Sequence, residues 1–187
     1  MPKKDLGMLN KSNCILLVID VQEAFRKVIH NFDETVNNIS KLIKVFNLLK
    51  MPIIATEQYP KGLGKTIEEI NNLLKNNNKI IEKTEFSCFD NKKFNSIIKK
   101  LNKKNIIVCG MEAHICVLKT ILNGLKNNYN MYLVVDSVSS RKLIDKNIAI
   151  EKIKKINAHL TTAESVVFQL ISSSKDKNFR EISKIIK

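Results

Sequence analysis

The sequence predicts a three-layer doubly wound α/β fold, in which a six-stranded parallel sheet carries helices on both faces. Two observations indicate this class. Short apolar, β-branched runs alternate along the chain with longer segments of helical period, which is the pattern of repeated β-α units. The first run, residues 14–20, is apolar up to its last residue, as in a strand covered on both faces of a parallel sheet. We expect one domain over residues 1–187, with a short N-terminal tail at 1–11.

The strands are expected where short apolar runs stand between turn signals. They are residues 14–20, 52–56, 79–82, 105–110, 131–135 and 159–161.

The helices are expected where apolar residues recur every three to four positions, as at Val36, Ile39 and Ile43. We expect Asp90 to cap the helix that follows it. Residues 58–66 contain Pro60, Gly62 and Gly64, so we expect a loop there, at the carboxyl edge of the sheet. The expected helices are 33–50, 67–75, 91–101, 113–127, 145–157, 163–171 and 178–186.

The chain is strongly basic, with a formal net charge of +14 carried almost entirely by lysine. Such a charge is compatible with nucleic-acid binding. The lysines, however, are spread over many predicted helix faces, and arginine, the usual reader of base edges, occurs only three times. We therefore favour a solvated lysine surface and regard nucleic acid as an unlikely partner.

The four cysteines show no CxxC pair, and this usage fits a reducing compartment. Cys14 and Cys109 lie in apolar runs and are expected to pack as small core residues. The first residues carry no apolar signal-peptide core, and no apolar run reaches membrane-spanning length. We expect a cytoplasmic protein that does not enter membranes, with a mitochondrial location left open.

Three reactive side chains stand at or after the ends of predicted strands. Asp20 ends the first strand, Lys83 follows the third, and Cys116 follows the fourth at the start of a predicted helix. Carboxyl ends of parallel strands meet at one edge of a sheet, so these residues are expected to converge there. A thiol at a helix N-terminus is expected to favour the thiolate, which is the nucleophile.

The chemistry of a cysteine hydrolase uses each of these residue types. Asp20 can accept the thiol proton, Lys83 can supply a cation, and backbone N–H groups before Cys116 can hold an oxyanion. Each residue also has a structural alternative: a strand-end Asp as a cap, a solvated Lys, and a buried inert Cys.

Several ordered motifs resemble those of the isochorismatase-like cysteine hydrolase superfamily, and within it the isochorismatase-domain-containing subgroup. The resemblance covers nearly the whole chain, from about residue 11 to 172. It lies in residues 17–25, 56–64, 83–88, 110–118, 135–141 and 160–169.

The resemblance implies a catalytic triad of Cys116, Asp20 and Lys83. It also places the family's non-proline cis peptide on Met111–Glu112, with the Glu112 and Cys116 N–H groups forming an oxyanion hole.

The substrate-binding residues are expected to come from three of these motifs. Phe25 matches a pocket residue of the family, and Gln22 is close enough in sequence to line the site. We place Phe86, Glu112 and His114 in the same set, the last two because they stand at a helix start.

Two other side chains keep alternative interpretations. Cys88 follows Lys83 closely but is expected to be a buried structural thiol. Arg141 follows the fifth strand, where it could bind an anion or equally form a structural ion pair or a subunit contact.

The chain departs from the zinc-binding nicotinamidases of this superfamily, which carry an Asp-x-His motif after the second strand. Glu57, Gln58 and Tyr59 stand there instead. We therefore expect no metal and no cofactor, and nicotinamide becomes doubtful as the substrate. True isochorismatases lack the nucleophilic cysteine, so Cys116 argues against vinyl-ether hydrolysis.

The leading hypothesis is a hydrolase that cleaves a C–N bond of a small molecule through a Cys116 thioester. A catalytically silent ligand-binding or interaction protein on the same fold, possibly nucleic-acid associated, remains the alternative. Phosphoryl transfer is disfavoured because Gln22 stands where a second acidic Mg²⁺ ligand would be needed. The resemblance further suggests a homo-oligomer.

Overall fold

The computed structural model describes residues 7–74 and 79–187 of the chain. Within these residues the strands form a six-stranded sheet of order β3-β2-β1-β4-β5-β6, and every neighbouring pair is parallel. The strand order reverses between β1 and β4, so the predicted doubly wound α/β class is confirmed. The strands are β1 Cys14–Ile19, β2 Ile53–Gln58, β3 Lys79–Lys83, β4 Asn105–Met111, β5 Asn130–Ser139 and β6 His159–Thr161.

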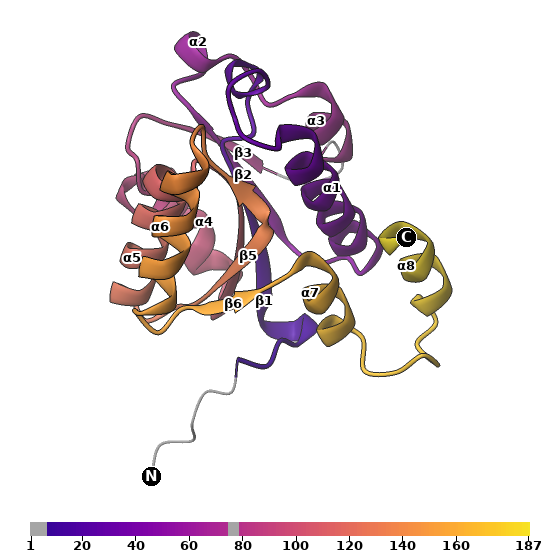
Figure 1. The fold of residues 1–187 in the computed structure, drawn as a ribbon. Helices are drawn as coiled ribbons and strands as arrows, with labels where there is room; N and C mark the ends of the chain where they lie inside the picture. Colours follow the sequence, from indigo (N-terminus) through magenta and orange to yellow (C-terminus); the bar gives the residue numbers. More distant parts are fainter. Residues whose placement is uncertain (1–6, 75–78) are drawn as a thin grey trace.

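The helices cover both faces of the sheet. Helices α1, α3, α7 and α8 lie on one side, and α4, α5 and α6 lie on the other (Figure 1). The α-helices are α1 Phe32–Leu48, α2 Pro60–Leu63, α3 Glu68–Leu74, α4 Lys92–Leu101, α5 Leu118–Lys126, α6 Leu143–Lys154, α7 Ala163–Leu170 and α8 Phe179–Ile186. Shorter helical turns are Lys11–Asn13, Glu23–Phe25 and Cys88–Asp90, of 3-10 type, and Ala113–Val117, of π type.

The uninterrupted apolar run of β1 results from burial on both faces. Cys14, Leu16 and Val18 pack into the core under α1 and α7, whereas Ile15, Leu17 and Ile19 pack into the core under α4, α5 and α6. Side chains alternate across a strand, so a strand between two helical layers needs apolar residues at every position.

Two parts of the predicted outline lie outside the described residues: residues 1–6 of the expected N-terminal tail and Lys75 of an expected helix. Where the expected tail ends, residues Lys11–Asn13 form a 3-10 turn that leads directly into β1.

Several predicted boundaries are wrong. The expected loop at 58–66 contains the short helix α2, which begins at Pro60, because proline is well suited to the first helical position. The helix α4 is capped by Asn91, whose side chain accepts a hydrogen bond from the Phe94 N–H, and Asp90 instead accepts one from Asn123. Strand β5 continues past Val135 to Ser139.

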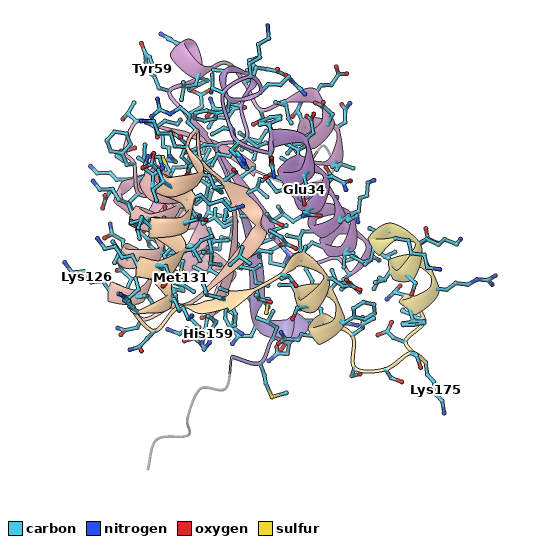
Figure 2. The ribbon with its side chains drawn as sticks, in the orientation of Figure 1. Glu34, Tyr59, Lys126, Met131, His159 and Lys175 are labelled. Carbon is cyan, nitrogen blue, oxygen red and sulfur yellow. The ribbon has the colours of Figure 1, made fainter. Side chains whose placement is uncertain are left out.

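The surface carries many of the lysine side chains, and they do not form one stripe. Lys126 and Lys175 project from different sides of the molecule, whereas Met131 lies inside, against α5 (Figure 2). Among the described residues no helix is both long and apolar enough to span a bilayer. The cellular location stays a prediction.

Candidate active site

The carboxyl edge of the sheet brings the three predicted catalytic residues together. Asp20 follows β1, Lys83 is the last residue of β3, and Cys116 lies in the π-helical turn after β4. All three are buried, with relative exposures of 1%, 3% and 6%. Charged groups are seldom buried this deeply unless they are paired, so the site is built around mutual neutralisation.

The Asp20 carboxylate is held by a hydrogen bond to each oxygen. The Lys83 ammonium donates to Oδ2 at 2.7 Å, and the Thr56 hydroxyl donates to Oδ1 at 2.6 Å. Asp20 also takes a left-handed backbone conformation, with φ of 52°. Such a conformation is uncommon for a residue other than glycine, and it turns the carboxyl group out of the strand direction.

Lys83 is anchored by two hydrogen bonds besides the one to Asp20. Its ammonium donates to Gln58 Oε1 at 2.7 Å and to the Glu85 carbonyl oxygen at 3.3 Å. Gln58 and Lys83 are direct partners in the β2–β3 register, which explains why their side chains meet. Burial is the largest single influence and lowers the pKa of Lys83, but the Asp20 carboxylate together with Cys88 and Cys116 raises it above its ordinary value.

Cys116 is a neutral thiol in this site, contrary to the thiolate predicted from a helix N-terminus. Burial is the main reason that the pKa of Cys116 is raised to about 12. The Asp20 carboxylate, which accepts a hydrogen bond from the thiol, also raises the pKa, whereas the Lys83 ammonium lowers it. The cysteine is the fourth residue of the π turn and not the first of α5. Burial and the Asp20 carboxylate therefore outweigh the helix dipole at this sulfur.

Gly110 allows the strands beneath the site to approach closely. Its φ is +114°, and a Cβ atom there would collide with the backbone oxygen of Ile19 in β1. Only glycine meets both conditions. The close contact between the ends of β1 and β4 brings Asp20 and Cys116 to the same point.

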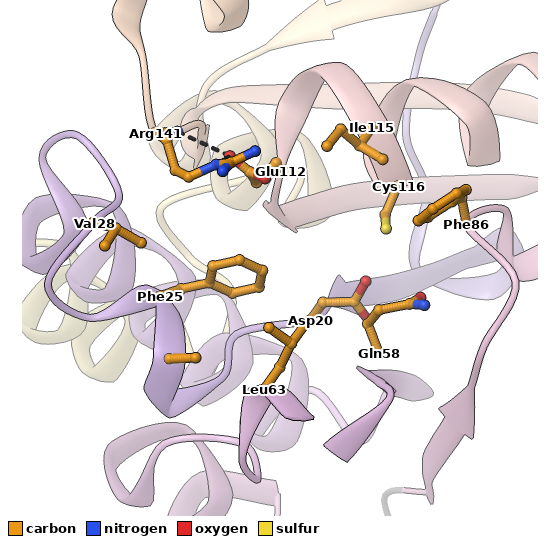
Figure 3. Close-up of a pocket in the computed structure, with 11 residues that line it drawn as sticks. Asp20, Phe25, Val28, Gln58, Leu63, Phe86, Glu112, Ile115, Cys116 and Arg141 are labelled. Atoms are coloured by element: carbon orange, nitrogen blue, oxygen red, sulfur yellow. Dashed lines mark hydrogen bonds and ion pairs between the residues drawn. The ribbon is translucent and has the colours of Figure 1, made fainter. Parts of the chain in front are cut away.

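A cavity of about 350 Å³ opens above these residues. In Figure 3 the sulfur of Cys116 points toward the Asp20 carboxyl group, Phe86 lies beside it, and Phe25 lies across the cavity. The predicted residues Asp20, Phe25, Phe86, Glu112 and Cys116 line this space. The other lining residues are Ala24, Val28, Gln58, Leu63, Ile115 and Arg141.

Glu112 and Arg141 form an ion pair at one wall of the cavity. Glu112 Oε2 accepts hydrogen bonds from the Arg141 backbone N–H at 3.0 Å and from its Nε at 3.1 Å. Of the three open interpretations of Arg141, the structure shows the ion pair. The peptide bond between Met111 and Glu112 is cis.

Gln22 and His114 do not line the cavity. The Gln22 side chain is fully buried and bonds the backbone of Gln58 in both directions, and its Nε2 also donates to the Gly64 carbonyl at 2.6 Å. His114 Nδ1 lies 3.0 Å from the Ser140 hydroxyl, on the side toward α6. Both residues hold the loops around the site, a role that spacing alone did not distinguish from ligand contact.

Cys88 is a fully buried neighbour of the three catalytic candidates. Burial raises the pKa of Cys88 to about 11, and its backbone N–H donates to the Thr120 hydroxyl at 3.0 Å. Thr120 lies one turn after Cys116, so this bond fixes the segment 88–90 against α5. All four cysteines are free thiols.

Glu57, at the position of the zinc motif, holds the loop that contains Thr66. Its Oε1 accepts hydrogen bonds from the Thr66 N–H and hydroxyl, both at 2.7 Å. Within the described ranges, no group of three His, Cys, Asp or Glu residues is arranged to hold a metal ion.

The sequence interpretation missed Gln58, Ile115 and Leu63 as cavity residues. Gln58 could have been found, because it ends β2 directly beside the end of β3, where Lys83 stands. Ile115 and Leu63 carry no comparable signal, since their positions depend on the π turn and on α2.

The strand order defines a doubly wound α/β protein, and a buried cysteine lies at the carboxyl edge of its sheet. The family model described as Isochorismatase domain matches residues 14–165, and the chain belongs to the isochorismatase family. The resemblance read from the sequence is thereby confirmed, and membership of this family indicates hydrolase activity.

Individual relatives agree with this placement. The Isochorismatase family protein 1A of Dictyostelium discoideum is 39% identical over 96% of this chain and 88% of that protein. The solved MAR1 ribonuclease of Caenorhabditis elegans is 37% identical, with a TM-score of 0.91 over 96% of this chain and 92% of that one. The YcaC gene product of Escherichia coli, described as an octameric hydrolase of unknown specificity, shares the fold at 20% identity, with a TM-score of 0.91 over 98% and 91% of the two chains.

Proposed function

We propose that this protein is a cysteine hydrolase that cleaves the C–N bond of a small amide through a thioester on Cys116, without a cofactor. The observation that carries the proposal is the buried Cys116–Asp20–Lys83 cluster at the wall of a cavity. A thiol, a base in contact with it and a cation that orients the base are the parts that nucleophilic catalysis requires.

The first step is acylation of Cys116. As the sulfur attacks the substrate carbonyl carbon, the thiol proton passes to the Asp20 carboxylate, and the carbonyl oxygen becomes an oxyanion. We assign its stabilisation to the N–H groups of Glu112 and Cys116, as the family resemblance implies. The C–N bond then breaks, and the protonated Asp20 returns the proton to the leaving nitrogen, so an amine or ammonia departs.

The second step is hydrolysis of the thioester. Water attacks the acyl carbon while Asp20 takes one of its protons, and that proton returns to the sulfur as the C–S bond breaks. The products are a carboxylic acid and the free thiol. Lys83 is protonated in the resting site, where Asp20, Cys88 and Cys116 together raise its pKa against the opposing effect of burial.

A neutral resting thiol fits this scheme. The raised pKa of Cys116 means that the nucleophile is generated only when Asp20 takes the proton during attack. Asp20 therefore has to be a working base and not only a structural partner of Lys83.

The decisive experiment compares Cys116→Ala with the wild type on a panel of small primary amides, by measuring ammonia release. We expect kcat/KM to fall by about a thousandfold or more. Cys14→Ala removes a buried thiol that does not line the cavity and serves as the control. Equal turnover by Cys116→Ala would refute the proposal. A wild-type protein that hydrolyses no amide would favour the catalytically silent alternative.

A second candidate function is action on RNA. Two observations favour it: the formal net charge of +14 and the 37% identity to a protein described as a ribonuclease. The candidate predicts RNA binding whose affinity falls steeply with salt concentration, because lysines would release counterions from the phosphates. Binding or cleavage that Cys116→Ala leaves unchanged would separate this function from the amide hydrolase.

We also propose that the chain assembles into a homo-oligomer. Leu143, Ile144 and Ile148 are 46%, 62% and 61% exposed on α6, and a relative that shares the fold is octameric. Light scattering coupled to size exclusion measures the state directly, and a monomer at micromolar concentration would contradict the proposal.

A further inference from the structure

We infer that the substrate of this site is a small uncharged carboxamide with an apolar acyl group. The inference rests on the proposed function, because it names the substrate class of the same cavity. It is carried by a juxtaposition: the Cys116 thiol faces a cavity whose charged groups are already paired and whose remaining walls are apolar.

The walls that surround the thiol are mostly hydrocarbon. Phe86 and Ile115 flank Cys116, and Phe25, Val28 and Leu63 lie on the facing sides (Figure 3). An acyl group that replaces water against these side chains gains free energy in proportion to its apolar area. A polar or charged acyl group would lose hydration there without finding a partner.

The charged groups of the cavity neutralise one another. Asp20 is paired with Lys83 at 2.7 Å, and Glu112 is paired with Arg141 at 3.1 Å. Gln58 is engaged as well, since its Oε1 accepts from Lys83 and its Nε2 donates to the Thr84 carbonyl at 2.8 Å. No net charge is left over to attract an ionic substrate, and an ion entering the cavity would compete with an existing pair.

The size of the cavity sets an upper limit on the substrate. Its volume of about 350 Å³ lies near the lower end of the range for small-molecule sites, which is about 300–1,000 Å³. That space holds a branched alkyl or single-ring amide. It does not hold a folded peptide segment or a dinucleotide.

The test compares amides of similar length that differ in charge at the far end: valeramide, succinamate and γ-aminobutyramide. We expect kcat/KM for valeramide to exceed that of either charged amide by about tenfold or more, because a charge has to be desolvated against apolar walls. Phenylacetamide is expected to be at least as good a substrate as valeramide, since aromatic side chains stand on two sides of the cavity.

Phe86→Ala tests the aromatic wall. It should lower kcat/KM for phenylacetamide about tenfold, mainly through KM, and by more than it lowers kcat/KM for acetamide. Phe168→Ala truncates an exposed aromatic residue of α7 outside the cavity and should change neither value.

Glu112→Gln leaves the Arg141 guanidinium without its carboxylate partner. The kcat/KM ratio of succinamate to valeramide should then rise several-fold, because the unpaired cation attracts the anion. Comparing the ratio within one variant cancels any general effect on catalysis.

The outcomes separate this inference from the proposed function. Turnover of succinamate or γ-aminobutyramide as fast as that of valeramide, lost in Cys116→Ala, would overturn the substrate class and leave the hydrolase proposal standing. If Glu112→Gln leaves the kcat/KM ratio of succinamate to valeramide unchanged, the claim that paired charges exclude ionic substrates is also contradicted. Failure to hydrolyse any amide would overturn both.

Discussion

The interior of the sheet and its carboxyl edge are parts of the same strands, yet opposite interactions stabilise them. In the interior, residues such as Leu17 and Val108 are fully buried among other apolar side chains. At the edge, Asp20, Lys83 and Glu112 are buried almost as deeply, and each is held by an oppositely charged partner. An apolar core tolerates hydrophobic substitutions of similar volume, whereas a buried charge is stable only while its partner is present. The edge is therefore the part of the molecule where a single change has consequences for both stability and chemistry.

The largest effect is expected from Lys83→Met, which removes the cation and leaves the Asp20 carboxylate buried and unpaired. We expect a loss of about 3–5 kcal/mol in the free energy of unfolding, together with loss of activity. Urea unfolding measures the change in the free energy of unfolding. The double variant Asp20→Asn/Lys83→Met should recover much of the stability without the activity, and a double variant as unstable as the single one would contradict the pairing argument.

The matching change in the interior is Leu17→Ala in β1. It should cost about 2–5 kcal/mol, through lost contacts and a cavity. Because no charge is involved, its cost should be the same at pH 6 and pH 9. A strongly pH-dependent cost would show that the interior and the edge are not independent.

A smaller effect is expected in Asp20→Asn, where the Cys116 thiol should become more reactive toward alkylating reagents. Asp20 raises the thiol pKa and Lys83 lowers it, so removing the carboxylate should bring the pKa down from about 12. More thiolate is then present at pH 8, and alkylation by iodoacetamide should become several-fold faster although hydrolysis is lost.

The readout is the rate of Cys116 modification followed by mass spectrometry over a pH series, on protein shown by circular dichroism to be folded. In the wild type the rate should still be rising at pH 10. Slower alkylation in Asp20→Asn than in the wild type at pH 8 would refute this account of the charges.

The smallest effect is expected at an exposed ion pair. Arg26 and Glu69 approach to 2.9 Å, but their side chains are 34% and 52% exposed. Glu69→Gln should change the free energy of unfolding by less than about 1 kcal/mol, because water screens both charges. A loss comparable to that of Lys83→Met would mean that burial does not explain the sensitivity of the edge.

The same contrast explains which features could be predicted from the sequence. Strands β1 and β4 were predictable because period and apolar content are local properties of the chain. The end of β5 was not, because Ser137 and Ser139 are polar and yet fully buried, and the Ser139 hydroxyl is satisfied by the distant His30 carbonyl oxygen. The positions of polar residues at strand ends were more predictable than the directions of their side chains.

Gln22 and His114 illustrate that limit. Both stand next to residues that line the cavity, and both turn away from it to hold neighbouring loops. Their directions depend on the turns at 58–66 and 113–117, whose conformations arise from tertiary contacts. The positions of Asp20 and Lys83, in contrast, depend on strand ends meeting at one edge, which the fold class itself dictates.

The raised pKa of Cys116 has a consequence for the durability of the protein. Peroxides oxidise the thiolate much faster than the thiol, so a cysteine that stays protonated at rest is slow to form sulfenic acid. Its partial burial slows that reaction further. The raised pKa therefore keeps the Cys116 sulfur mainly in the form that peroxides attack slowly, and oxidation proceeds chiefly through the small deprotonated fraction.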